Sequence, residues 1–233
     1  MDNSDNTANT VRQIEILKQF VTENRYQRML RIVEERTQYM SIVLENIYQP
    51  HNTSAVLRSC DCFGIQDVHV IENENKYSLN KDIALGSSNW LNIVRYNENK
   101  NNTAECLNSL KSKGYRLVAT LPSPTATSIF DFDVSAGKFA LLMGTELTGL
   151  SDIACKIADE NIYLPMVGFT ESLNISVTAA TFMFYLSQKI KKLDIAWQLD
   201  DITKNEVLLN WLINSVKSGN EILDRFDGEG CLV

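Results

Sequence analysis

The side chains best suited to chemistry lie in three short segments. The first is an apolar helix that contains Asn52 and a single arginine, Arg58. The second places Glu146 in a loop, and the third places Ser172 and Asn174 directly before a long helix. An arginine in an apolar helix needs an anionic partner, either an acid of the protein or an oxyanion of a ligand. Ser172 and Asn174 also have an ordinary structural interpretation, because both residue types cap helices.

Each segment follows a predicted strand, which is where open parallel sheets bind ligands. Gly144 and Gly149 flank Glu146, and such loops let backbone N–H groups approach a ligand, although plain turn glycines would look the same. No G-x-G-x-x-G follows the first strand and no Walker loop is present, so we expect no ordinary dinucleotide or nucleoside triphosphate site. With His51 and His69 as the only histidines, we expect no metal site and no hydrolase triad.

The elements that carry these segments alternate between strand and helix. Short apolar runs are typical of buried parallel strands, and we predict strands at 39–47, 68–72, 89–96, 115–121, 138–144 and 161–166. Spaced apolar positions predict helices, two of them closed by Gly64 and Gly114, at 11–37, 53–63, 103–113, 174–191 and 205–217. The predicted fold class is α/β, with a mainly parallel sheet and flanking helices.

The helix predicted at 174–191 is apolar almost all round. A helix of this kind is buried on more than one side. The sheet can cover one side, and a second subunit is a candidate for the other. The apolar side chains are Val177, Ala180, Phe182, Met183, Phe184 and Leu186.

Charge is unevenly distributed along the chain. The 233 residues carry a net charge of −7, which argues against nonspecific coating of nucleic acid. Residues 194–233 hold eight acids and three bases, so −5 of this charge lies in the C-terminal segment. Residues 12–36 are net +2, with Arg25, Arg28 and Arg31 spaced three apart. This basic helix face either contacts RNA or is simply solvated, and the sequence leaves both interpretations open.

The composition is typical of a cytoplasmic globular protein. Hydrophobic residues make up 44% of the chain, which is enough for a substantial core. The five cysteines are irregularly spaced, so we expect free thiols rather than disulfides. The first ten residues lack the basic and apolar regions of a secretory signal, and no stretch is long and apolar enough for a membrane span. We therefore expect a cytoplasmic location.

Three motifs, in this order and separation, resemble those of a known family. They are PHNTSAVLRSCDCFG (50–64), LLMGTELTGLS (141–151) and IYLPMVGFTESLNISVTAA (162–180), and they are similar to the signature motifs of SpoU-type SPOUT methyltransferases. The flanking residues 25–52 and the helix around Trp211 also resemble the tRNA guanosine-2'-O-methyltransferases that modify guanosine 18 in the D-loop.

The resemblance implies a fold, an activity and partners. The fold would contain a deep trefoil knot in the C-terminal half of the domain, and the chain would form a homodimer. The methyl donor would be S-adenosylmethionine and the substrate tRNA. The implied domains are an N-terminal helical extension that contacts RNA (1–38), the methyltransferase domain (39–192) and a C-terminal helical extension (193–233).

The resemblance also gives Arg58 a role. It falls at the position of the residue that activates the ribose 2'-hydroxyl, either by accepting its proton or by remaining cationic and stabilising the alkoxide. Asn52 would orient Arg58 or the substrate. The structural alternative for Arg58 is an ion pair with an acid such as Asp61 or Glu146.

The remaining site residues follow from the other two motifs. Glu146 would hold the guanidinium or the ribose, and Ser172 and Asn174 would bind substrate or shape the knot loop. The donor would be held mostly by backbone, with apolar side chains beside the adenine. The residues implied for donor binding are Thr120, Leu121, Gly144, Leu164, Met166 and Leu173.

The identity of the RNA rests on charge. Phosphate neutralisation would have to come from the basic residues of 12–36 and from Arg95, Lys189, Lys191 and Lys192. Two alternative functions remain. One is 2'-O-methylation of ribosomal RNA or of another tRNA position, and the other is a noncatalytic RNA-binding protein of the same fold.

Overall fold

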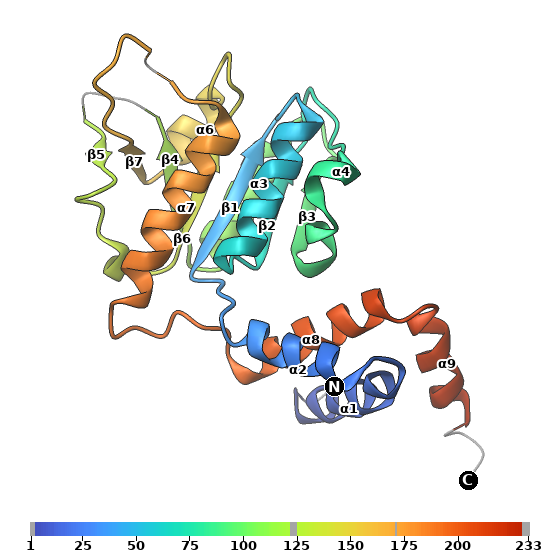
Figure 1. Cartoon of the computed structure of the whole chain (residues 1–233). Coiled ribbons are helices and arrows are strands. Elements are labelled where there is room, and N and C mark those ends of the chain that lie inside the picture. Colours follow the sequence, from blue (N-terminus) through green and yellow to red (C-terminus); the bar gives the residue numbers. More distant parts are fainter. Residues whose placement is uncertain (1–2, 122–124, 171, 230–233) are drawn as a thin grey trace. The chain divides into compact units, whose positions relative to one another are not determined.

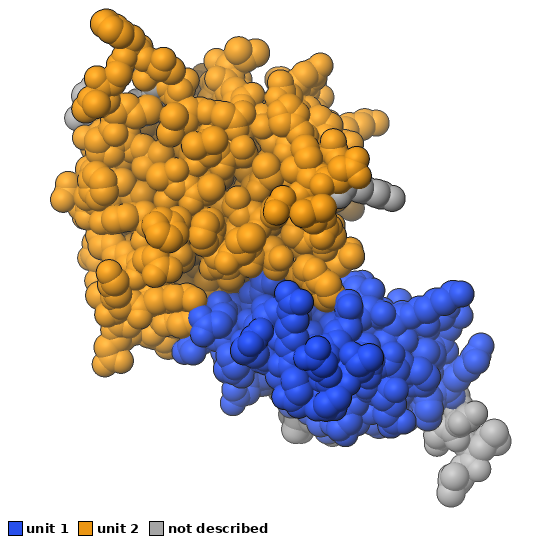
Figure 2. All heavy atoms as spheres, viewed as in Figure 1, with its two compact units in different colours: residues 1–36, 198–233 blue, residues 37–197 orange. Residues whose placement is uncertain are grey.

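The structure is a computed structural model that describes residues 3–121, 125–170 and 172–229. The chain divides into two compact units (Figure 2). One unit joins residues 1–36 to residues 198–233, and the other consists of residues 37–197. The two ends of the chain therefore fold together, although the sequence suggested two separate extensions.

The unit of residues 37–197 is an α/β fold (Figure 1). Its described strands are β1 (Met40–Glu45), β2 (Asp67–Ile71), β3 (Asn92–Tyr96), β4 (Arg116–Thr120), β5 (Thr127–Ser128), β6 (Phe139–Met143) and β7 (Glu160–Tyr163). Its described helices are α3 (Pro50–Phe63), α4 (Lys81–Ala84), α5 (Thr103–Ser112), α6 (Asp152–Ile157) and α7 (Ile175–Lys191), with 3-10 turns η2 (Ser87–Trp90) and η3 (Val134–Ala136).

The strands form one sheet in the order β3-β2-β1-β6-β4-β7-β5, and the paired strands are all parallel. The predicted α/β class with a mainly parallel sheet is confirmed. Every residue of β1 and β6 is buried, as expected for central strands covered on both faces. The strands β1, β6, β4 and β7 are neighbours, so the loops that follow them lie at one edge of the sheet.

Helices cover both faces of the sheet. Alternate side chains of β1 point to opposite faces. Ile42 packs in a core with Leu57 of α3 and Phe182 of α7, whereas Val43 packs in a second core with Leu107 of α5. The helices α3 and α7, which carry two of the three motifs, therefore share one face of the sheet (Figure 1).

The long helix α7 is buried on one side only within a single chain. Phe182, Met183 and Leu186 face the core and are at most 1% exposed. Val177 and Phe184 are instead 49% and 56% exposed. The sheet thus covers one of the two apolar faces predicted from the sequence, and the other faces outward.

The unit formed by the two chain ends is helical. It consists of α1 (Asn3–Leu17), a 3-10 turn η1 (Lys18–Phe20), α2 (Glu23–Val33), α8 (Asp201–Ser215) and α9 (Gly219–Glu229). The prediction of one helix over 11–37 is wrong. Thr22 is extended, with φ −69° and ψ 148°, and its side chain accepts a hydrogen bond from the backbone N of Arg25. Threonine favours this N-cap geometry over a helix interior, so a second helix starts here.

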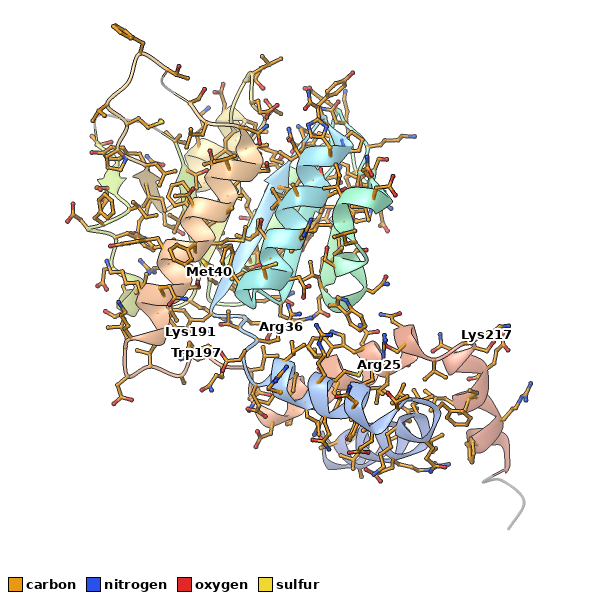
Figure 3. All side chains as sticks on the ribbon, in the orientation of Figure 1. Arg25, Arg36, Met40, Lys191, Trp197 and Lys217 are labelled. Carbon is orange, nitrogen blue, oxygen red and sulfur yellow. The ribbon has the colours of Figure 1, made fainter. Side chains whose placement is uncertain are left out.

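A buried arginine joins the two ends of the chain. Arg36 is 1% exposed, and its guanidinium lies 5.1 Å from the ring centre of Trp211 in α8 (Figure 3 labels Arg36). Around this contact, Val33 of α2 and Leu212 of α8 are buried. Arg36 therefore belongs to the core of this unit and not to an exposed basic face.

None of the helices in the described part of the chain is long and apolar enough to cross a membrane.

Candidate active site

Three side chains from the three motifs form one hydrogen-bonded cluster. Nδ2 of Asn52 donates to Oε1 of Glu146 at 2.9 Å, and Nδ2 of Asn174 donates to the same oxygen at 2.6 Å. Asn174 Nδ2 also lies 3.2 Å from Oδ1 of Asn52. The Glu146 carboxylate thus joins α3, the loop after β6 and the start of α7.

Local structure orients both asparagines. Asn52 is 2% exposed in the first turn of α3, and its Nδ2 also donates to Oε1 of Gln49 at 3.2 Å. Asn174 is the N-cap of α7, and its Oδ1 accepts from the backbone N of Ser176 at 2.9 Å. Because the cap uses Oδ1, Nδ2 remains to donate to Glu146. Asn174 therefore caps the helix and binds the carboxylate at the same time.

The loop that carries Glu146 depends on a close backbone approach. A Cβ atom on Gly144 would lie 2.1 Å from the carbonyl carbon and oxygen of Gly149, so only glycine fits there. Thr145 and Gly149 exchange two backbone hydrogen bonds of 3.0 Å, and Gly149 has a left-handed φ of +68°. The two glycines are thus required by the loop geometry, beyond any role in ligand binding.

A cavity of about 230 Å³ lies beside the cluster and shares Glu146 with it. The cavity is lined by all six residues predicted to bind the donor and by two of those predicted to act on the substrate. They are Thr120, Leu121, Gly144, Leu164, Met166 and Leu173, together with Glu146 and Ser172. Ile162, Ile175 and Phe182 add apolar walls. The structure therefore brings all six residues expected to bind a donor to one cavity, together with four of the five residues expected to act on a substrate: Asn52, Glu146, Ser172 and Asn174.

Arg58 is not brought to this cluster within one chain. It is exposed on α3, and six residues of helix place it about 120° around the axis from Asn52. Among the described residues it makes no hydrogen bond and no ion pair. The structural alternative, a pair with an acid such as Asp61 or Glu146, is not formed among the described residues of the single chain. Its guanidinium is available to a ligand or to another chain.

Sequence reasoning missed three polar contributors. Gln49 contacts Asn52, and its position just before a proline at the first helical residue is a signal that could have found it. Tyr163 lines the cavity from the end of β7, where the strand-end rule points. Thr178 lines it from inside α7 and had no distinctive sequence pattern.

Several basic residues expected to neutralise phosphates are engaged within their own unit. Arg95 forms two hydrogen bonds of 2.8 and 3.0 Å with Glu72. Lys189 donates to two backbone carbonyls, at 2.7 and 3.0 Å, and Lys191 lies 5.1 Å from the ring centre of Trp197 (Figure 3 labels Lys191 and Trp197). These three side chains already have partners within the protein, which reduces the positive charge that they can offer to RNA phosphates.

The profile of the SpoU rRNA methylase family matches residues 39–184. The chain belongs to this family. The matched range includes all three motifs and therefore every residue of the cluster and of the cavity named above. The SpoU methylase assignment agrees with the parallel sheet and with the position of the site at its carboxyl edge.

Named relatives of this SpoU methylase cover most of its length. It is 38% identical over 208 residues to the tRNA (guanosine(18)-2'-O)-methyltransferase of Borreliella burgdorferi, covering 89% of this chain and 93% of that protein. The crystal structure of the A. aeolicus TrmH/SpoU tRNA modifying enzyme matches with a TM-score of 0.74 and 27% identity, covering 84% of this chain and 98% of that one.

A more distant likeness shares the fold. The SpoU methyltransferase AviRb from Streptomyces viridochromogenes, solved in complex with the cofactor AdoMet, matches with a TM-score of 0.58 and 22% identity. That match covers 70% of this chain and 65% of AviRb.

Proposed function

We propose that this SpoU methylase transfers a methyl group from S-adenosylmethionine to the ribose 2'-oxygen of guanosine 18 in tRNA. The observation that carries the proposal is the cluster of Asn52, Glu146 and Asn174 beside the cavity. The names of the Borreliella burgdorferi and A. aeolicus relatives support tRNA as the substrate class. Because tRNA is handled in the cytosol, we expect the protein there. The trefoil knot remains a prediction.

The cavity suits the proposed donor. Gly144 leaves backbone atoms at the wall where any side chain would clash, and Leu121, Leu164 and Ile162 provide apolar surface for an adenine. Glu146 adds a carboxylate suited to the neighbourhood of a sulfonium cation. When bound, the donor supplies a methyl group on a good leaving group, so this chain must only hold it and orient an oxygen nucleophile.

The nucleophile would be prepared by the cluster together with Arg58. Glu146, held by two amide groups, orients the ribose or the guanidinium. Arg58 accepts the proton of the 2'-hydroxyl or stabilises the alkoxide as a cation. In the first role the proton goes to the guanidinium, and in the second it goes to solvent, so the rate of methyl transfer should rise with pH in both.

The site would be completed by a second copy of the chain. Ala55, one turn before Arg58 on α3, lines a shallow hollow together with Ser59 and with Val177 and Phe184 of α7. The exposed apolar side of α7 would be removed from water if a second chain packed against it. Pairing two such faces would bring Arg58 near the site of the other chain.

This assembly predicts a stable dimer at micromolar concentration. Replacing Phe184 with glutamate should release monomers, because a charge would be buried in the apolar contact. Val94, 41% exposed on the edge strand β3, gives the control variant Val94→Glu, which should stay dimeric. Light scattering distinguishes the states, and a monodisperse wild-type monomer would refute the dimer.

Contact of the N-terminal helical segment with RNA would depend on the arginines of α2. Arg28 and Arg31 are exposed and make no hydrogen bond or ion pair with described residues, whereas Arg25 donates to Oγ of Ser215 at 3.1 Å (Figure 3 labels Arg25). Replacing Arg25, Arg28 and Arg31 with glutamine should raise the KM for tRNA and flatten its salt dependence, because fewer counterions are released.

The donor affinity of this triple variant should be unchanged, since the cavity is formed by the other unit. KM values for tRNA at two salt concentrations test the idea. Equal salt slopes for the variant and the wild type would show that these charges are only solvated.

Asn174 offers a way to separate its two contacts. Asn174→Asp keeps a good N-cap but sets a second carboxylate against Glu146, so methyl transfer should fall on the order of 10²-fold with little change in thermal stability. Asn174→Ala should lose about 1 kcal/mol of stability with the cap. Melting curves and single-turnover rates give both quantities. Normal transfer by the aspartate variant would remove Asn174 from the site.

The direct test of the function is mapping of 2'-O-methyl groups in bulk tRNA after incubation with enzyme and labelled donor. Methylation at guanosine 18 supports the proposal. Label at another tRNA position or only in ribosomal RNA supports the first alternative. Absence of donor binding would support a noncatalytic RNA-binding protein.

A further inference from the structure

We propose that Glu45 is a positioning residue that fixes the loop carrying Glu146, and through it one wall of the cavity. The inference rests on the proposed function in that it takes the cavity as the donor site. The loop runs from Gly144 to Ser151, and five of its residues line the cavity: Gly144, Thr145, Glu146, Gly149 and Leu150.

The Glu45 carboxylate is buried and fully engaged. It ends the central strand β1 and is 2% exposed. Its Oε2 accepts from the backbone N of Ser151 at 2.8 Å. Its Oε1 accepts from Oγ of Ser151 at 2.7 Å and from Oγ1 of Thr103 at 2.5 Å. Two of the three bonds therefore hold one residue, Ser151.

This carboxylate has no charged partner in the described part of the chain. Burying an acid without a cation is costly unless hydrogen bonds replace its water. Here the hydrogen bonds come from neutral donors, those of Ser151 and Thr103. A neutral side chain of similar size, such as glutamine, would avoid the free-energy cost of burying a charge. The position of a carboxylate at this strand end is better explained by what it holds in place.

Ser151 marks the far end of the loop. Its Oγ also accepts from the backbone N of Ala154 at 3.1 Å, so it starts α6. The near end follows β6 and is fixed by the packing of Gly144 against Gly149. Glu146 lies between these two fixed points. Loss of the bonds between Glu45 and Ser151 would leave the loop held only by the close approach of Gly144 to Gly149 and by the bonds of Glu146 to the two asparagines.

The same strand end also leads to the first motif. Asn46 follows Glu45 with a left-handed φ of +55°, and its Oδ1 accepts from the backbone N of Asn73 at 2.8 Å. The chain turns there toward Asn52. Glu45 therefore lies next to the segment that leads to Asn52 and also binds the loop that carries Glu146. In this way it sets the position of Asn52 relative to Glu146.

The first experiment measures hydrogen exchange of the enzyme without any ligand. Glu45→Gln should keep the fold but loosen its hold on Ser151, because an amide offers one acceptor in place of two. Amides of residues 144–151 should exchange at least tenfold faster than in wild type. Thr103→Val is the matched control, since it removes a bond to the same carboxylate but leaves both bonds to Ser151 intact.

The second experiment measures donor binding and turnover in the same variants. Displacement of a positioned group by about 1 Å can cost on the order of 10²-fold in rate. We expect Glu45→Gln to weaken S-adenosylmethionine binding in calorimetry and to lower kcat at saturating donor, with an unchanged KM for tRNA. Ser151→Ala should behave in the same way, Ser151→Thr should restore function, and Thr103→Val should match wild type.

The outcomes separate this inference from the proposed function. Wild-type exchange and donor affinity in folded Glu45→Gln would overturn the positioning role. Equal effects of Glu45→Gln and Thr103→Val would also overturn it, by assigning Glu45 to general stability. If wild-type enzyme binds donor but does not methylate tRNA, the function fails while exchange and calorimetry still test Glu45.

Discussion

Arg58→Ala should lower the rate of methyl transfer by on the order of 10²- to 10⁴-fold, the range that one proton-handling or oxyanion-stabilising group contributes. The side chain is exposed and makes no hydrogen bond or ion pair with described residues, so its loss should leave the melting temperature nearly unchanged. Donor affinity should also persist, because Arg58 does not line the cavity. Single-turnover rates, melting curves and donor calorimetry measure the three quantities.

Arg58→Lys should fail almost as badly. A lysine keeps the charge but lacks the planar fork of donors that a guanidinium offers to an alkoxide or a phosphate. The control is Arg28→Ala, an exposed arginine on a different helix, which should keep the single-turnover rate at saturating tRNA. Near-normal turnover of Arg58→Ala would remove Arg58 from the site.

Gly144→Ala should abolish donor binding and destabilise the enzyme. The added Cβ would lie 2.1 Å from backbone atoms of Gly149 and 2.3 Å from the backbone N of Leu150, and neither contact can be relieved by a side-chain rotation. The loop must move, and overpacking of this kind costs about 1–3 kcal/mol. Calorimetry with S-adenosylmethionine and thermal melting measure the two effects.

Gly149→Ala is the matched variant for this experiment. A Cβ there would meet no atom within 4 Å, and only the left-handed φ of +68° opposes it. Its cost should be about 1 kcal/mol, with donor binding weakened but measurable. If Gly144→Ala bound donor as well as Gly149→Ala does, the close approach at Gly144 would not matter for the cavity.

Local signals in the sequence were sufficient for much of the fold. Six predicted strands correspond to β1, β2, β3, β4, β6 and β7, because each is a short apolar run, and the central strands β1 and β6 are fully buried. Gly64 closes α3 in the left-handed conformation, as its position predicted. The two-residue strand β5 and the helix α9 carried no comparable pattern and were not predicted.

Features that depend on distant residues were not accessible from local pattern. The break at Thr22 competes with a continuous apolar spacing, and the pattern alone favoured one helix. Arg36 looked like part of a basic face, yet Trp211 at the other end of the chain buries it. The bonds from Asn52 and Asn174 to Glu146 likewise join residues that only the strand order brings together.

The shared core of residues 1–36 and 198–233 has a consequence for biosynthesis. The ribosome releases the first segment long before the last one exists, and at 5–20 residues per second the delay is roughly 10–30 s. During this interval Val33 and Leu17 lack part of their core, while the intervening unit can already fold. A chain truncated by a premature stop near residue 198 would never acquire the missing partners. Its N-terminal segment would keep apolar side chains exposed and would be prone to aggregation and proteolysis.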